Sequence, residues 1–318
     1  MTALPSNRQT VKPSNRLTVE PPLPPIPPPD AEGWTSSTPV PLYWCAYGAA
    51  PERALVLHGG PGASHDYLLP QMLRLAERRA LVLYDQRGGG RSRHDDDRET
   101  ISWGTQAEDV ARVCLELALE RPVVIGYSWG GLLAMLHALV AHERGDARTL
   151  PSRLVLIDPA PITRAFREEF EAEFARRQAG PAVQALRDEL AASGLRERDP
   201  EAYRHRAFEV SVAGYFADPR RASDLTPFRV VGRVQQSIWS SLGDFDLRPQ
   251  LEALRAETGI PALVVHGRQD PIPLASSEAC ARALGAELVV LEDCGHVPYV
   301  EQPDALFAAI ERFLGEDG

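Results

Sequence analysis

Six short apolar runs follow one another along the chain from about residue 40 onward, most of them ended by Gly, Pro, Asp or His. Their apolar residues are continuous and do not alternate with polar ones. Such runs are typical of parallel strands that helices cover on both faces. The runs occupy residues 54–57, 80–84, 122–126, 154–157, 262–265 and 287–291.

The segments between these runs carry apolar residues at helical spacing, as in residues 108–120 and 130–142. They are long enough for the right-handed crossovers that join parallel strands. The pattern predicts a doubly wound, mostly parallel α/β core over residues 39–160 and 248–318. In such a sheet, ligands gather at the carboxyl ends of the strands.

Residues 161–247 break this rhythm, because they are rich in Glu, Arg, Ala and aromatic residues and contain no good strand. Their periodicity predicts an inserted helical cap that begins near Arg164. Proline disfavours helix in the residue before it, so the helices should be interrupted near several proline and glycine positions. These are Gly180-Pro181, Gly194, Asp199-Pro200 and Asp218-Pro219.

Residues 1–38 differ from the rest in their proline-rich run at 21–29. Proline lacks the amide donor that helices and sheets require and favours polyproline II. We therefore predict a disordered tail. A PxxP ligand for a partner domain is the alternative, which we favour less because such matches are common by chance.

The composition of the chain limits the kinds of partner that it can bind. The 318 residues are 44% apolar, and the net charge of −10 comes from 44 acidic and 34 basic residues, which argues against a nucleic-acid-binding surface. No apolar run approaches the roughly 20 residues of a membrane span, no signal-peptide pattern opens the chain, and the four cysteines form no CxxC pair. We expect a cytoplasmic protein with reduced thiols and no nucleic-acid or membrane partner. The oligomeric state is not indicated.

The most informative motif is Gly126-Tyr127-Ser128-Trp129-Gly130, between an apolar run and a helical segment. A G-x-S-x-G sequence in this context is typical of a nucleophile elbow, where small residues two positions before and after the serine relieve crowding in a sharp turn. The helix N-terminus offers unpaired N–H groups where negative charge would develop during acyl transfer. Ser128 is therefore the predicted nucleophile.

A serine nucleophile needs a base that is oriented by a carboxylate, and in this fold the chain order is Ser, acid, His. His296 follows the last apolar run in a loop that would return over the carboxyl edge of the sheet, so it is the predicted base. Asp270, in the loop after the preceding run, is the predicted acid. Asp158 and Asp293 remain alternative acids, because Asp158 also follows a run and Asp293 is close to His296 in sequence.

A second glycine-rich segment, His58-Gly59-Gly60-Pro61-Gly62, follows the first apolar run. Glycines let the backbone approach a ligand closely, so the N–H of Gly60 can join the N–H of Trp129 in an oxyanion hole. A phosphate-binding loop is the rival interpretation, but neither GxxxxGK[ST] nor GxGxxG is present and the proline removes one donor. No cofactor and no metal is predicted.

Together the motifs resemble the proline iminopeptidases and their relatives among the serine peptidases of the α/β-hydrolase fold. The resemblance covers about residues 40–160 and 255–315. Besides the two glycine-rich motifs, it rests on Asp85-Gln86-Arg87-Gly88-Gly89-Gly90-Arg91-Ser92, Gly267-Arg268-Gln269-Asp270 and Gly295-His296. It implies an acyl-enzyme route without metal and the removal of an N-terminal residue, often proline, from short peptides.

The chain departs from the peptidases that it resembles. Tyr127 and Gly89 stand where glycine and cysteine are usual, and no segment aligns with the glutamate-bearing one that binds the free amine of the substrate. An exopeptidase needs such a carboxylate, because an unpaired buried ammonium is costly. The candidates are Glu168, Glu169 and Glu209, although a charge-rich helix usually leaves such side chains in water.

The predicted function is that of a serine hydrolase in which Ser128 attacks a carbonyl, His296 transfers the proton and Asp270 orients the imidazole. The predicted reaction is the release of an N-terminal residue from a short peptide. One alternative keeps this machinery but hydrolyses esters or other small acyl compounds, because the inserted segment sets the substrate. A non-enzymatic binding protein on this fold is a further alternative, against which the complete set of catalytic residues argues.

Overall fold

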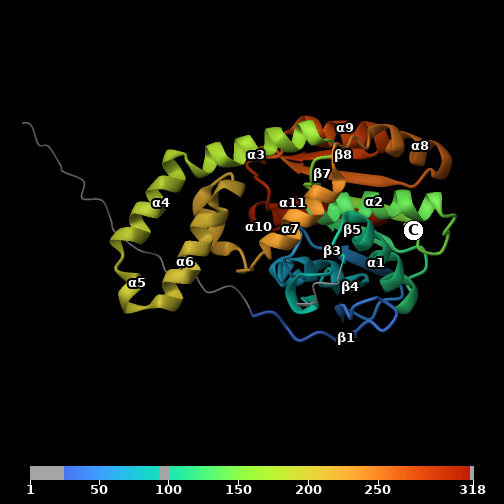
Figure 1. The fold of residues 1–318 in the computed structure, drawn as a ribbon, viewed down its shortest axis with the longest axis horizontal. Coiled ribbons are helices and arrows are strands. Elements are labelled where there is room, and N and C mark those ends of the chain that lie inside the picture. Colours follow the sequence, from blue (N-terminus) through green and yellow to red (C-terminus); the bar gives the residue numbers. More distant parts are fainter. Residues whose placement is uncertain (1–24, 94–99, 316–318) are drawn as a thin grey trace, which may run out of the picture.

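An eight-stranded sheet forms the centre of the computed structural model, which describes residues 25–93 and 100–315 (Figure 1). The strands are β1 (Ala31–Trp34), β2 (Tyr43–Tyr47), β3 (Arg53–Leu57), β4 (Ala80–Tyr84), β5 (Val123–Tyr127), β6 (Arg153–Ile157), β7 (Ala262–Gly267) and β8 (Glu287–Leu291). Their order is β1-β2-β4-β3-β5-β6-β7-β8. β2 is antiparallel to both of its neighbours, and every other neighbouring pair is parallel. The predicted doubly wound, mostly parallel α/β fold is confirmed.

The six predicted strands correspond to β3 through β8. Every residue of β4, β5 and β7 is buried, which explains why their sequences are continuously apolar. Along β3, Ala54 and Val56 join the apolar cluster on one face of the sheet, whereas Leu55 and Leu57 join the cluster on the other face. Both faces of these strands therefore lie in the core.

The two antiparallel strands are the ones that the apolar pattern did not predict. β2 has the sequence Tyr-Trp-Cys-Ala-Tyr, in which buried and partly buried residues alternate and the Val, Leu and Ile of the predicted strands are missing. β1 lies at the sheet edge with mostly exposed side chains, and it corrects the predicted tail over residues 1–38, because backbone pairing with β2 places Ala31–Trp34 in the sheet. Residues 1–24 of that predicted tail lie outside the described residues.

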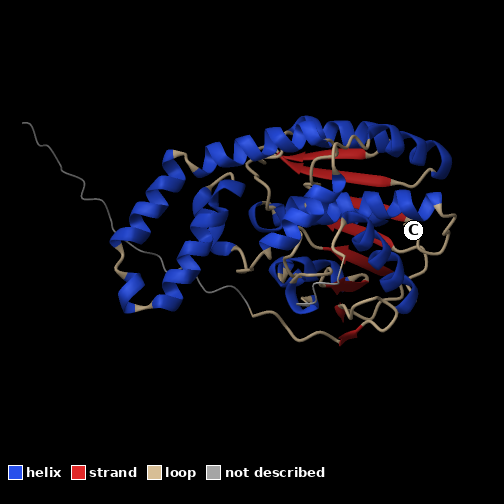
Figure 2. Ribbon diagram, in the orientation of Figure 1, coloured by secondary structure: helices blue, strands red, loops and turns tan. Residues whose placement is uncertain are grey.

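Helices cover both faces of the sheet (Figure 2). On one face, the apolar residues of the central strands pack against α1 (Trp103–Glu116), α2 (Trp129–Glu143), α8 (Arg248–Thr258) and α9 (Leu274–Leu284). On the other face they pack against α10 (Pro298–Glu301) and α11 (Pro303–Gly315). The resulting three layers leave the carboxyl edge of the sheet as the place where loops and inserted segments meet.

The segment between β6 and β7 is helical, in agreement with its sequence pattern. It contains α3 (Arg164–Gln178), α4 (Pro181–Ala192), α5 (Leu195–Arg198), α6 (Pro200–Val212) and α7 (Gly232–Leu242). Each predicted interruption falls between these helices or at the start of a short 3₁₀ turn at Pro219. Figure 1 shows α4, α5 and α6 projecting away from the sheet. That this segment is a separate cap stays a prediction.

Two further features concern the helices and the thiols. Within residues 25–93 and 100–315, no helix has the length and apolar character needed to cross a bilayer. All four cysteines are buried and free. Burial raises the pKa of Cys114 and of Cys280 to about 12, so both thiols remain protonated at neutral pH.

Candidate active site

Ser128 lies in the sharp turn between β5 and α2 with a φ of 53°, an unusual value for a residue with a side chain. Gly126 and Gly130 make this turn sterically feasible. A Cβ at Gly126 would lie 2.3 Å from the carbonyl oxygen of Gly130, and one at Gly130 would lie 2.0 Å from that of Leu57. The backbone N–H of Ser128 donates to the carbonyl of Ile157 at 2.9 Å, which ties the strained turn to β6.

The structure brings Ser128, His296 and Asp270 together at the carboxyl edge of the sheet. His296 Nε2 lies 2.9 Å from Ser128 Oγ, and His296 Nδ1 lies 2.7 Å from Asp270 Oδ2. The three residues follow β5, β8 and β7 respectively, so parallel strands place them at the same edge. Of the alternative acids, neither Asp158 nor Asp293 makes this hydrogen bond with His296. This geometry would allow a serine nucleophile, a base and an orienting acid to act together.

Backbone and side-chain hydrogen bonds fix the loop that carries His296. Its N–H donates to the carbonyl of Tyr215 at 2.7 Å, and its own carbonyl accepts from the hydroxyl of Tyr127 at 2.8 Å. The buried carboxylate of Glu301 accepts from the N–H of Gly295 at 2.7 Å. The elbow, the inserted segment and α10 therefore all fix the backbone that carries the imidazole.

The neighbouring acid is fixed in a similar way. Asp270 Oδ1 accepts from the N–H of Ile272 at 2.7 Å. Arg177 of α3 donates to the backbone carbonyls of Gln269 and Asp270, the second bond being 3.3 Å long. The inserted segment thus contacts the loops of both the base and the acid.

Sequence reasoning did not identify Tyr127, Tyr215, Arg177 or Glu301 as contributors to the site. Of these four, only Tyr127 was noticeable in the sequence, because it occupies a position of the elbow where glycine is usual. The others act through backbone carbonyls or N–H groups, and such contacts leave no motif. Their roles follow from the way the chain folds.

Burial determines the protonation states of Asp270 and His296. Loss of hydration raises the pKa of Asp270 to about 7, although the hydrogen bond from the N–H of Ile272 partly opposes this. The same cause lowers the pKa of His296 to about 4. At neutral pH the imidazole is therefore uncharged, which is the state that can accept a proton from Ser128.

The predicted oxyanion donors lie beside the nucleophile. Gly60 and Trp129 both line the cavity that contains Ser128. Trp129 is the first residue of α2, so its N–H belongs to the turn that has no acceptor within the helix. Gly60 has a φ of 57°, and a Cβ at the adjacent Gly59 would lie 2.8 Å from Ser128 Cβ, so this approach requires glycine.

The inner cavity, which contains Ser128 and His296, has a volume of about 450 Å³. Its walls are mainly aromatic and aliphatic, and no Asp, Glu, Lys or Arg is among the described residues that line it. The principal wall residues are Tyr67, Tyr127, Phe170, Phe174, Phe208, Tyr215, Leu225, Phe228, Val230 and Trp239. Such a cavity favours an uncharged, apolar group next to the reactive serine.

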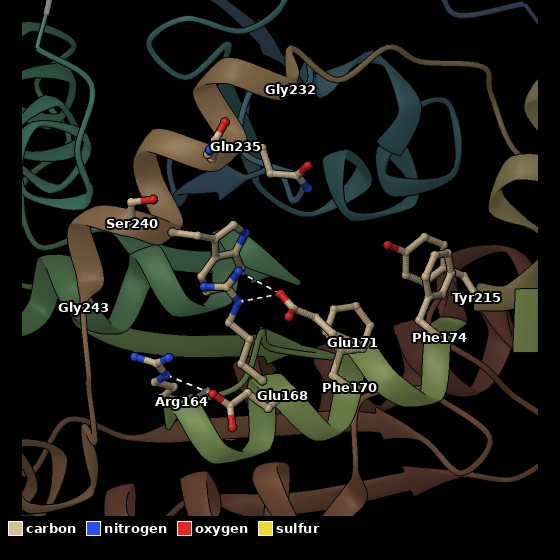
Figure 3. A pocket seen from close by; sticks show the side chains of 13 residues that line it. Arg164, Glu168, Phe170, Glu171, Phe174, Tyr215, Gly232, Gln235, Ser240 and Gly243 are labelled. Atoms are coloured by element: carbon tan, nitrogen blue, oxygen red, sulfur yellow. Dashed lines mark hydrogen bonds and ion pairs between the residues drawn. The ribbon is translucent and has the colours of Figure 1, made fainter. Parts of the chain in front are cut away.

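An outer cavity of about 800 Å³ adjoins it, and its walls combine charged and aromatic side chains (Figure 3). Arg164 pairs with Glu168 at 3.0 Å, and Arg167 pairs with Glu171 at 2.7 Å. The guanidinium of Arg167 also lies over the ring of Trp239, 4.3 Å from its centre. The two cavities share Phe170, Phe174, Tyr215, Gln235 and Trp239 as walls.

The three glutamates proposed for binding a substrate amine do not reach Ser128. Glu168 lines the outer cavity and is paired with an arginine, and Glu169 is exposed on α3. Glu209 is buried on α6, where it pairs with Arg206 and lies 3.2 Å from His205 Nε2. None of the three lines the inner cavity. Their positions differ from the expectation because sequence does not fix which way a helix of the insertion faces.

A cluster of metal-binding residue types lies beneath the site. Within the described part of the chain, Asp158, His266 and Asp270 have side-chain N or O atoms within 4.8 Å of one another. Asp158 and His266 each have one partnered atom, since Gly267 N–H donates to Asp158 Oδ1 at 2.8 Å and Ser277 Oγ lies 2.9 Å from His266 Nδ1. Asp158 Oδ2 and His266 Nε2 have no hydrogen-bond partner among the described residues. We interpret the cluster as a hydrogen-bonded network and assign no metal to it.

Comparison with known proteins matches residues 54–310 to the alpha/beta hydrolase family. The proline iminopeptidase of Heyndrickxia coagulans is 27% identical over 280 residues, covering 82% of this chain and 89% of its own. The solved proline iminopeptidase of Mycobacterium smegmatis has a TM-score of 0.61 at 22% identity, covering 90% of this chain and 98% of that one. A 2-hydroxy-6-oxo-6-phenylhexa-2,4-dienoate hydrolase from Rhodococcus sp. strain RHA1 has a TM-score of 0.62 at 21% identity, with the same coverage. The predicted resemblance to proline iminopeptidases is confirmed, and the solved structures show a shared fold.

The hydroxyl of Tyr127 provides a first test of the site. Tyr127→Phe removes its hydrogen bond to the His296 carbonyl, so we expect the free energy of unfolding to fall by about 1 kcal/mol. We expect kcat to fall about threefold to tenfold, because the imidazole is less well oriented. Urea denaturation and steady-state kinetics measure the two effects. Tyr84→Phe is the matched control, since the buried hydroxyl of Tyr84 has no hydrogen-bond partner among the described residues; equal effects of both variants would refute the role of Tyr127.

The pH dependence of kcat/KM provides a second test. Because burial raises the pKa of Asp270 to about 7, its protonated form predominates below that pH and no longer supplies the negative charge that stabilises a protonated His296. Activity should therefore decrease as the pH falls through about 7. A profile measured from about pH 4 to about pH 9 that stays flat on the acid side would contradict this assignment.

Proposed function

The chain belongs to the alpha/beta hydrolase family, and from this premise we propose that it is a serine hydrolase that acts through an acyl-enzyme. Ser128 is the nucleophile, His296 the general base and acid, and Asp270 the residue that orients the imidazole. The observation that carries this proposal is the continuous chain of hydrogen bonds from Ser128 Oγ through His296 to Asp270, 2.9 Å and 2.7 Å long. The N–H groups of Gly60 and Trp129 are the proposed oxyanion donors.

In the proposed mechanism, Ser128 Oγ attacks the carbonyl carbon of the substrate while His296 Nε2 takes the hydroxyl proton. The carbonyl oxygen becomes an oxyanion, which the N–H groups of Gly60 and Trp129 stabilise. The tetrahedral intermediate collapses as His296 gives its proton to the leaving group, and an ester of Ser128 remains. Water then attacks this ester with the same assistance from His296, releasing the carboxylic acid and the free serine.

The lining of the inner cavity supports a substrate class. With no Asp, Glu, Lys or Arg among its described lining residues, the cavity would desolvate a charged group without supplying a counter-ion. We propose an uncharged substrate with an apolar group beside the scissile carbonyl, such as a carboxylic ester or a blocked amide. The outer cavity, whose walls include charged and amide side chains, can receive a hydrogen-bonding portion of the same molecule.

Release of an N-terminal residue, often proline, is the second candidate. It is favoured by the name of the relative from Heyndrickxia coagulans and by the presence of Glu168 and Glu171 in the outer cavity. Both carboxylates are paired with arginines. A substrate ammonium would have to compete with those guanidinium groups and lie outside the inner cavity.

Labelling with a fluorophosphonate tests the nucleophile. We expect the wild-type protein to be labelled at Ser128, and Ser128→Ala to lose the label and to lose at least about a thousandfold in kcat. Ser211→Ala is the matched control, because Ser211 lines the same cavity but its hydroxyl donates to the carbonyl of Phe208. Turnover by Ser128→Ala close to that of the wild type would refute the proposed mechanism.

A pair of esters tests the substrate class. N-acetylphenylalanine nitrophenyl ester and phenylalanine nitrophenyl ester differ in whether the amine is blocked or charged. We expect kcat/KM for the blocked ester to be at least about tenfold higher, because the free ammonium would be buried without a partner. Prolyl-naphthylamide measured in parallel decides the second candidate, and its preference over both esters would establish the aminopeptidase instead.

A further inference from the structure

A second buried aspartate lies next to the site without a part in the proposed mechanism. Asp158 immediately follows β6, is fully buried and has a φ of 40°, a strained value for a residue with a side chain. Its N–H donates to the carbonyl of Val265 at 2.8 Å. The residue is therefore held between the ends of β6 and β7, directly beneath the loop of Asp270.

The side chain of Asp158 is only partly satisfied by hydrogen bonds. Oδ1 accepts from the N–H of Gly267 at 2.8 Å and lies 3.5 Å from His266 Nδ1. Oδ2 is buried and receives no hydrogen bond from the described residues. The carboxyl groups of Asp158 and Asp270 approach within 4.8 Å. Asp158 thus has one carboxyl oxygen available to carry a proton toward its neighbour.

Two ionised carboxylates this close in a water-poor interior repel each other strongly, so one of them holds a proton. Asp270 accepts hydrogen bonds from His296 and from the N–H of Ile272, which stabilise its ionised form. Asp158 has a single amide donor. Burial raises the pKa of Asp158 well above its ordinary range, and the charge of Asp270 adds to the effect.

The other charged groups around Asp158 and Asp270 do not change which of the two holds the proton. The other titratable or charged groups facing the pair are His266, Cys294, His296, Glu301 and Arg177. Three tyrosines, Tyr127, Tyr215 and Tyr299, also face it and have raised pKa values. Burial lowers the pKa of His266 to about 3, so it brings no positive charge, and Arg177 is engaged with backbone carbonyls and Glu173.

We propose that Asp158 is a positioning residue that keeps its proton at neutral pH and donates it in a hydrogen bond to Asp270. This hydrogen bond favours the ionised form of Asp270, which points at His296 although both are buried. This inference rests on the proposed serine hydrolase function. It is consistent with the hydrogen bond from Asp158 lowering the pKa of Asp270 against the effect of burial.

Two substitutions distinguish the effect of the Asp158 proton from the effect of its side-chain volume. Asp158→Asn keeps a donor toward Asp270, so we expect kcat/KM within about threefold of the wild type and an unchanged acid limb of the pH profile. Asp158→Ala removes the donor, so the acid limb should move to higher pH by about one unit. Asp293→Asn is the control for losing a nearby acid, because Asp293 is exposed and does not contact Asp270.

Two outcomes of these profiles would overturn the proposal. An acid limb that moves to lower pH in Asp158→Asn would mean that Asp158 is ionised in the wild type and repels Asp270. An unchanged limb in a folded Asp158→Ala variant would mean that its proton does not act on Asp270. Failure of the proposed function is recognised separately, because the wild type would then show no turnover that depends on Ser128.

Unfolding provides a readout that needs no activity. A carboxyl that is protonated when folded but has an ordinary pKa of about 3.9 when unfolded releases a proton on unfolding. Stability from this group is therefore greatest below about pH 4 and is lost as the pH rises toward the folded pKa. The ratio of the unfolding constants of the wild type and Asp158→Asn should grow by up to about tenfold per pH unit from about pH 5 to about pH 8. Parallel pH dependences would refute the buried proton even if the alanine variant did not fold.

Discussion

The hydrogen bond between His296 and Asp270 is the contact on which the site depends, because it joins two loops that the chain places on neighbouring strands. It survives in a buried setting only if each partner keeps the right protonation state. The sheet supplies the alignment: parallel pairing of β5, β6, β7 and β8 brings their carboxyl ends to one edge. The strained turn at Ser128 then places a hydroxyl within reach of the imidazole.

The inserted segment contributes to the reactive groups as well as to the walls around them. Tyr215 lines the inner cavity, and its carbonyl also accepts the N–H of His296. Arg177 of α3 binds the carbonyls of the loop that carries Asp270. A shift of α3 would therefore change both the shape of the cavity and the alignment of the imidazole. Substrate selection and reactivity are physically coupled in this arrangement.

The parts of the structure that follow from local rules could be predicted from the sequence. Strands buried on both faces appear as continuous apolar runs, and Ser128, Asp270 and His296 occupy loops whose order along the chain is fixed by the fold. β1 could not be predicted, because an edge strand with exposed side chains has no apolar pattern. The positions of Glu168, Glu169 and Glu209 could not be predicted either, since they depend on how α3 and α6 are oriented against the core.

The apolar inner cavity imposes a cost on the groups that would react inside it. The same exclusion of water that would strengthen the hydrogen bonds of an oxyanion also destabilises an ionised Asp270 and raises its pKa to about 7. A drier cavity therefore needs more hydrogen-bond donors directed at Asp270 from within the protein. The N–H of Ile272 is one such donor, and the proton that we assign to Asp158 would be another. On this view, the two aspartates at the ends of β6 and β7 are needed together because the cavity above them is apolar.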